Sequence, residues 1–186
     1  MIIIKDVDAV ESWVVGHDAL GFTKNMFLNL TNAQQTSSTI WNDTAPTSSV
    51  FSIGTSDGVN KTETHVAYCF AEIDGYSKIS SFEGNGSTDG PFVYTGFKPS
   101  WLMIKRASGG TGNWDIFDNQ RDPINVVDAV LDADANTAET TYATIKIDFL
   151  SNGFKVRGTQ TNINSSGDTY VYMALAESPF KTATAR

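Results

Sequence analysis

Two histidines, His17 and His65, are the side chains that could act as neutral bases near pH 7. His17 follows the segment Trp13–Gly16, and His65 begins a run of alternating apolar residues. Neither histidine lies in a nucleophile elbow, a phosphate-binding loop or a His-Glu-x-x-His motif, the local patterns that bring a base to a reacting group. The sequence therefore predicts no catalytic residue and no cofactor, and we expect a protein that is not an enzyme.

Acidic pairs leave one enzymatic alternative open. A glycosidase needs two Asp or Glu side chains at a set distance from each other, and the sequence hides that distance. With 21 acidic residues in the chain, such a pair is available. A glycan-cleaving enzyme therefore stays an alternative to a structural protein.

The segment 132–136 has the opening spacing of a calcium loop. Asp132, Asp134 and Asn136 place three oxygen donors at alternate positions. Position six of such a loop needs a glycine and position twelve a bidentate glutamate, but these positions hold Thr137 and Ala143. The sequence thus favours a solvated acidic loop, and no metal site is predicted.

Flat aromatic rings could bind sugar rings, because binding surfaces are rich in Trp and Tyr. Trp13 and Trp114 occupy matching places in an internal repeat described below, which favours a packing role for both. Trp41 is the better surface candidate because turn-like residues follow it. Five residues are candidates for surface or ligand contact: Trp41, Tyr76, Tyr94, Asp118 and Arg121.

Composition limits the partners and the compartment. The net charge of −8 repels phosphate backbones and anionic lipid headgroups, so nucleic acid and membrane surfaces are poor partners. No apolar run approaches the ~18 residues of a spanning helix, and the chain reads as soluble. The single cysteine, Cys69, rules out a disulfide within the chain and is expected to be a small buried apolar residue.

Apolar residues alternate at a period of two, which is typical of strands. The clearest example is a hairpin of segments 145–149 and 154–157, joined at Asn152-Gly153, where we expect positive φ angles. Residues 29–35 and 126–136 could be short helices or irregular loops. The sequence predicts an all-β fold with little helix, an antiparallel β-sandwich of jelly-roll or lectin-like type.

The chain also repeats itself at an offset that grows from about 101 to 105 residues. The same face of the last strand is apolar in both copies, so we expect the two halves to pack face to face. The aligned segments are Ile2–Lys5 with Leu102–Lys105, Trp13 with Trp114, Val50–Ile53 with Gly153–Val156, and Val66–Glu72 with Val171–Glu177.

We interpret residues 1–186 as one sandwich domain with a first copy at 1–74, a connector at 75–99, a second copy at 100–180 and a tail at 181–186. The connector holds Phe82, Phe92, Tyr94 and Phe97, so it is predicted to form two strands rather than a flexible linker. No equivalent pair precedes the first copy, and we expect a partly bare edge or core face near Ile2–Ile4. The predicted core includes Phe51, Tyr68, Phe70, Phe149, Phe154, Met173 and Leu175.

Several motifs resemble a repeated domain of bacteriophage virion and tail-associated proteins, mainly of marine and cyanobacterial phages. They cover nearly the whole chain: Gly75–Lys78, Gly84–Phe97, Trp101–Arg106, Gly112–Trp114, Asp118, Arg121–Pro123, Phe149–Phe154 and Tyr172–Ala174. The family pattern usually has a glycine-rich strand and a His-Gly-Leu-like segment before the first Ile-Ile-Lys, and this sequence shows neither.

The resemblance implies a virion structural protein, in the first place a tail-fibre or tail-appendage module that contacts the host surface. A capsid decoration protein is the alternative. The implied partners are other virion proteins, further copies of the chain in a homo-oligomer such as a trimer, and a host glycan or receptor. The implied location is the virion, on the tail or on the capsid surface.

Overall fold

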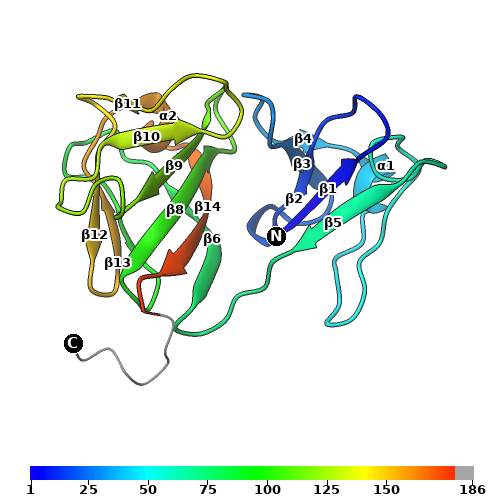
Figure 1. Ribbon diagram of the computed structural model, residues 1–186, viewed down its shortest axis with the longest axis horizontal. Coiled ribbons are helices and arrows are strands. Elements are labelled where there is room, and N and C mark those ends of the chain that lie inside the picture. Colours follow the sequence, from blue (N-terminus) through cyan, green and yellow to red (C-terminus); the bar gives the residue numbers. More distant parts are fainter. Residues whose placement is uncertain (179–186) are drawn as a thin grey trace.

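The computed structural model describes residues 1–178, which form antiparallel β-sheets packed on one another (Figure 1). This confirms the predicted all-β sandwich. Its helices are single turns: η1 (Asp18–Leu20), α1 (Ser38–Trp41) and α2 (Thr161–Asn164). Neither segment considered for a helix is helical, since 126–136 contains a strand and most of 29–35 is irregular. Within the described residues, no helix is long and apolar enough to cross a membrane.

Three sheets make up the fold. The first, in the order β4-β3-β2-β1-β5, contains Gln35–Thr36 (β4), Lys24–Phe27 (β3), Val14–Gly16 (β2), Ile2–Asp6 (β1) and His65–Cys69 (β5). The second, in the order β11-β10-β9-β8-β14-β6, contains Thr140–Thr141 (β11), Ala129–Asp132 (β10), Trp114–Asp118 (β9), Pro99–Arg106 (β8), Thr169–Ala176 (β14) and Ser77–Glu83 (β6). The third, in the order β12-β13-β7, contains Ile147–Leu150 (β12), Gly153–Val156 (β13) and Phe92–Tyr94 (β7).

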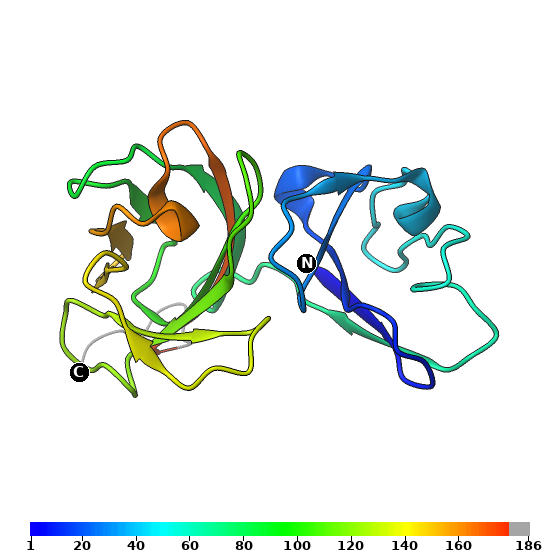
Figure 2. The same cartoon turned by 90° about the horizontal axis from the view of Figure 1, so that it is seen from above.

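Three apolar clusters hold these layers together. The middle cluster joins the two halves of the chain, because Ile3 and Met26 of the first sheet pack with Met103 and Met173 of the second. A second cluster fills the space between the six-stranded and three-stranded sheets, and a third lies between the first sheet, α1 and the loops after it. Figure 2 shows the halves side by side, with the five-stranded sheet facing the six-stranded one.

The strand order of the first sheet recurs in the second. β1, β2, β3, β4 and β5 correspond to β8, β9, β10, β11 and β14, and β6 is an additional strand beside β14. The pairing registers agree with the sequence alignment: Ile3 pairs with Tyr68, and their counterparts Met103 and Met173 also pair. The two halves are therefore built on the same antiparallel plan.

Matching lysines follow the same plan. The Lys5 ammonium donates to the main-chain oxygen of Ala9 at 3.0 Å, and the Lys105 ammonium donates to that of Gly112 at 2.5 Å. Each lysine thus ties the first long strand of its half to the loop that follows it. A charged donor on a loop oxygen is a strong contact, which explains why both copies keep a lysine there.

The predicted hairpin is present, with Ile147 opposite Val156 and a tight turn between β12 and β13. The expected positive φ angles are wrong, because neither Asn152 nor Gly153 has one and Gly153 is already the first residue of β13. Gly153 serves another purpose there. A Cβ atom at this position would lie 2.1 Å from the main-chain oxygen of Val93, so glycine lets β7 approach.

The connector forms the two predicted strands, β6 and β7. β6 adds to β14, and β7 adds to β13, so both strands complete the second half. The expectation of a bare edge near Ile2–Ile4 is wrong, because β1 pairs with β2 on one side and with β5 on the other. The edge strands of the first sheet are the two-residue β4 and the longer β5.

The predicted core is partly right. Phe149, Phe154 and Met173 are buried, while Phe51 and Leu175 are half-buried. Tyr68 and Phe70 are 46 % and 37 % exposed, and Cys69 is exposed, so these three predictions are wrong. The reason is their position on and just after β5, the edge strand of its sheet, whereas β14 is flanked by β8 and β6.

Candidate functional site

His17 lies at the interface between the halves, where it is almost completely buried. Its Nδ1 accepts a hydrogen bond from the main-chain N–H of Ala19, and its Nε2 lies 3.3 Å from the main-chain oxygen of Tyr172. These partners fit a neutral ring with the proton on Nε2. Burial lowers the pKa of His17 to about 4. Both ring nitrogens thus have partners, and the Nε2 contact with Tyr172 joins the halves.

His65, on β5, has a main-chain oxygen near each ring nitrogen, and a neutral ring can donate to one of the two. Its Nδ1 lies 3.0 Å from the main-chain oxygen of Glu63, and its Nε2 lies 3.4 Å from that of Asp57. The Asp6 carboxylate is 4.0 Å from Nε2. This arrangement holds the loop before β5 against the sheet.

The two aspartates of segment 132–136 make different contacts. Asp134 accepts a hydrogen bond from the main-chain N–H of Trp114 at 2.8 Å, which ties the loop after β10 to β9. Asp132 lies opposite Asp115 in the β9–β10 register. Burial raises the pKa of Asp115 well above its ordinary value, and the neighbouring Asp132 adds to this effect. Among residues 1–178, no three His, Cys, Asp or Glu side chains form a group that could hold a metal ion.

Trp41, a predicted surface residue, is fully buried, so its expected exposure is wrong. The single turn α1 points its indole into the first half, where it meets the Phe22 ring edge-to-face at 5.5 Å. Gly16 on β2 makes room for both rings, since a Cβ atom there would lie 2.7 to 2.8 Å from them. Trp41 is a core residue of the first half.

The other predicted contact residues lie in three places. Tyr76, just before β6, and Tyr94 on β7 are both exposed, but they belong to different sheets. Asp118 and Arg121 do meet: the guanidinium binds the Asp118 carboxylate at 2.5 Å and the Glu139 carboxylate at 3.0 Å. This partly buried pair fixes the turn after β9. Tyr94 is therefore the residue of this set whose ring is most open to a ligand, with 65 % of its surface exposed.

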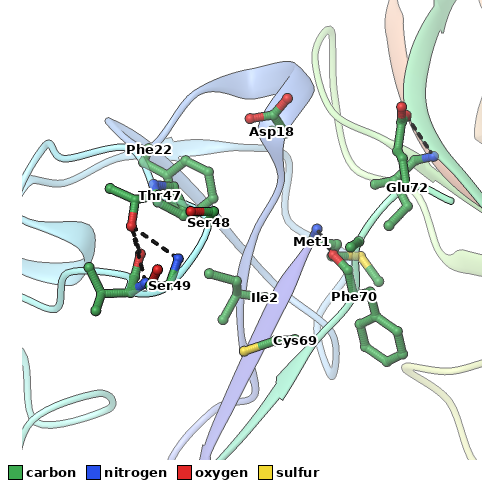
Figure 3. A pocket seen from close by; sticks show the side chains of 14 residues that line it. Met1, Ile2, Asp18, Phe22, Thr47, Ser48, Ser49, Cys69, Phe70 and Glu72 are labelled. Atoms are coloured by element: carbon green, nitrogen blue, oxygen red, sulfur yellow. Dashed lines mark hydrogen bonds between the residues drawn. The ribbon is translucent and has the colours of Figure 1, made fainter.

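A groove of about 560 Å³ opens beside β5 in the first half (Figure 3). Ile2 and Cys69, on neighbouring strands, form its floor, and the loop that carries Thr47 and Val50 lies across from them. Phe22 closes one side. Asp18 and Glu72 also line the groove, and the Glu72 carboxylate binds the Lys78 ammonium at 2.9 Å. The lining thus combines apolar side chains with two carboxylates.

The end of β5 borders a second hollow, of about 230 Å³, on the side of the six-stranded sheet. Cys69, Phe70 and Ala71 line both hollows, and Met173 and Leu175 line the second. This end of β5 is therefore open on two faces as well as along its edge. It is an accessible stretch of sheet for a binding partner.

Sequence reasoning missed this site, although one signal pointed to it. The first copy was seen to lack the connector strands, but the bare edge was expected at Ile2–Ile4. The alignment of Val66–Glu72 with Val171–Glu177 shows that β5 corresponds to β14. Since β6 pairs with β14, the missing connector leaves β5 as the open strand, but the sequence does not show that pairing. Strand neighbours of this kind depend on topology, which the sequence does not display.

The comparisons with known proteins place the chain in a family. No curated protein matches it, and no solved structure matches it. A family model does match, over residues 1–179. The chain belongs to the family described as Domain of unknown function (DUF7483).

Proposed function

We propose that the chain is a structural protein of a bacteriophage particle, a module of a tail fibre or tail appendage that assembles with other virion proteins and contacts the host surface. The observation that carries this proposal is the open β5 edge beside an apolar groove. Permanent assemblies commonly form by adding a strand to such an edge. The motifs that resemble phage tail-associated domains support the same assignment.

The buried ionisable side chains fit a structural role. His17 and Lys105 use their polar atoms to bind main-chain oxygens across the interface between the halves. Trp114 does the same with its indole N–H. Such contacts join the two halves into one unit, which suits a part that transmits attachment forces.

Host contact is assigned to β7. Phe92 and Tyr94 alternate on this strand, so their rings lie on one face, and both are exposed. Exposed aromatic rings on one face are suited to stacking on sugar rings. The net charge of −8 disfavours anionic partners, so neutral envelope glycans are the expected class.

Location on the particle is the direct test. Antibodies against the chain, applied to intact particles of the phage that encodes it, should label tail fibres or appendages by immunogold electron microscopy. Label on the head would replace the proposal with the capsid decoration alternative. Particles that carry no chain at all would overturn both.

Binding to host cells tests the contact surface. The Tyr94→Ala variant should bind intact host cells about fivefold or more weakly than the parent protein, because it removes a rigid aromatic contact. Val10→Ala is the matched control, since Val10 is fully exposed in the loop after β1. Soluble oligosaccharides released from host envelope glycans by the parent protein would instead favour the glycan-cleaving alternative.

A further inference from the structure

The connector adds strands to the sheets of the second half, and no segment does the same for the first half within residues 1–178. β6 pairs with β14, and β7 pairs with β13. Within residues 1–178, β5 has no partner strand on its outer side, and Val50–Ile53, the counterpart of β13, belongs to no sheet. The first half thus has an open strand edge where the second half has the connector; we call this edge and the groove beside it the connector seat.

The register identifies the vacant main-chain groups. The Phe70 N–H donates to the main-chain oxygen of Met1 at 2.8 Å, and the Val7 N–H donates to that of Thr64 at 2.9 Å. Main-chain groups of successive residues point to opposite sides of a strand, so the N–H and C=O groups of His65, Ala67 and Cys69 point away from β1. The alignment places these three residues at the positions of Tyr170, Tyr172 and Ala174. Those counterparts pair with β6 residues, namely Phe82, Ser80 and Lys78.

The apolar seat is vacant too. In the second half, the Phe82 ring stacks on Tyr170 at 5.2 Å and meets Phe154 at 5.9 Å. Phe51 occupies the position of Phe154 in the first half and is only half-buried. The position equivalent to that of Phe82 is opposite His65, the counterpart of Tyr170. The groove lies nearer the Cys69 end of β5, with Ile2, Phe22 and Val50 along its walls.

We propose that the first half binds an extended, connector-like segment of a second polypeptide chain, which pairs with the β5 edge, places an aromatic side chain opposite His65 and crosses the groove lined by Ile2, Phe22 and Val50. The inference rests on the proposed function and names the partner of its assembly site. Charge supports the choice of occupant. Asp18 lines the groove, whereas the Glu72 carboxylate already binds the chain's own Lys78 at 2.9 Å. The connector carries Lys78 opposite Ala174, the counterpart of Cys69, so the corresponding lysine of the bound segment would lie at the end of β5 that borders the groove.

The probe for this inference is a fluorescent synthetic peptide with the sequence of residues 76–99, added to the full chain. Fluorescence anisotropy should show saturable binding, and hydrogen exchange should slow at the amides of His65, Ala67 and Cys69. A peptide carrying Phe82→Ala should bind at least fivefold more weakly. Slower exchange confined to β14 would overturn the inference, because the peptide would then have replaced the chain's own β6.

Protein variants test the two parts of the seat separately. Val50→Asp puts a charge in the groove and should weaken peptide binding at least tenfold, whereas Val10→Asp, far along the chain and fully exposed, should leave binding unchanged. Ala67→Pro removes one outward N–H, which an edge strand tolerates, and should also weaken binding. Val50 is itself largely exposed, so its variant keeps the test valid if Ala67→Pro does not fold.

Two further outcomes overturn the inference. One is the absence of saturable binding, and the other is a dimer of the chain, seen by light scattering, in which β5 amides are protected without peptide. If antibodies label the tails but the peptide does not bind the chain, this inference is rejected and the proposed function stays in place. Unlabelled particles would reject the proposed function whatever the peptide does.

Discussion

The indole Nε1 of Trp114 donates a hydrogen bond to the main-chain oxygen of Phe27 at 2.8 Å, across the interface between the two halves. Trp114 is almost completely buried there, in the cluster that also contains Met26 and Met103. Its counterpart in the first half, Trp13, is half-buried and stacks on Tyr68 at 6.3 Å. Both tryptophans contact the cluster between the halves, but Trp114 alone of the two donates a hydrogen bond across it, and Trp13 stacks on Tyr68 of β5.

We expect Trp114→Phe to lower the free energy of unfolding by about 2 kcal/mol, because it leaves the Phe27 oxygen without its donor and makes a small cavity. Trp13→Phe is the matched control and should cost less than about 1 kcal/mol, since a partly exposed ring loses less burial. Urea unfolding measures both values. Equal losses in the two variants would contradict a joining role for Trp114.

Much of the fold follows from short-range patterns. The alignment of Ile2–Lys5 with Leu102–Lys105 holds in the structure because both segments are central strands of the same plan. The connector aromatics correctly indicate two strands, since large apolar side chains need a sheet to cover them. What alternation cannot show is which faces stay uncovered, so Tyr68 and Phe70 were expected inside.

The candidate site was less predictable. Trp41 has a sequence context typical of a loop, yet a single helical turn directs it against Gly16. Cys69 sits in an apolar run but lies on an edge strand. In both cases burial is decided by contacts between segments far apart in the chain, and a local pattern carries no information about them.

His17 should make stability depend on pH. Its pKa is lowered to about 4 by burial, from 6.5, so between these values the unfolded chain binds a proton that the folded chain does not. Stability from the neutral ring is fully present above pH 6.5 and is lost as the pH falls toward 4, by up to about 3 kcal/mol. The difference in unfolding free energy between the parent protein and His17→Gln should shrink over this range. Parallel curves from pH 7 to pH 4 would reject this role.

Asp115 should act in the opposite sense. Its folded pKa is raised above the ordinary value of 3.8, so above pH 3.8 the folded chain holds a proton that the unfolded chain releases. The stability from this group is therefore present at low pH and is lost as the pH rises through the folded pKa. Asp115→Asn should raise the unfolding free energy at pH 8, on the order of 1 kcal/mol, with no gain near pH 4. Asp43→Asn, at an exposed position where asparagine suits the positive φ, should change neither value.

Gly153 should be required for the connector to reach the second half. A Cβ atom at this position would lie 2.1 Å from the Val93 oxygen, which is main chain and cannot move without breaking the β7–β13 pairing. We expect Gly153→Ala to cost about 2 kcal/mol or more and to speed hydrogen exchange in β7 before other strands. Gly58→Ala is the control, because its Cβ atom would make an ordinary 3.4 Å contact with the Val14 side chain. If Gly153→Ala unfolds at the same urea concentration as Gly58→Ala and protects β7 equally well, then β7 is not held by this close approach.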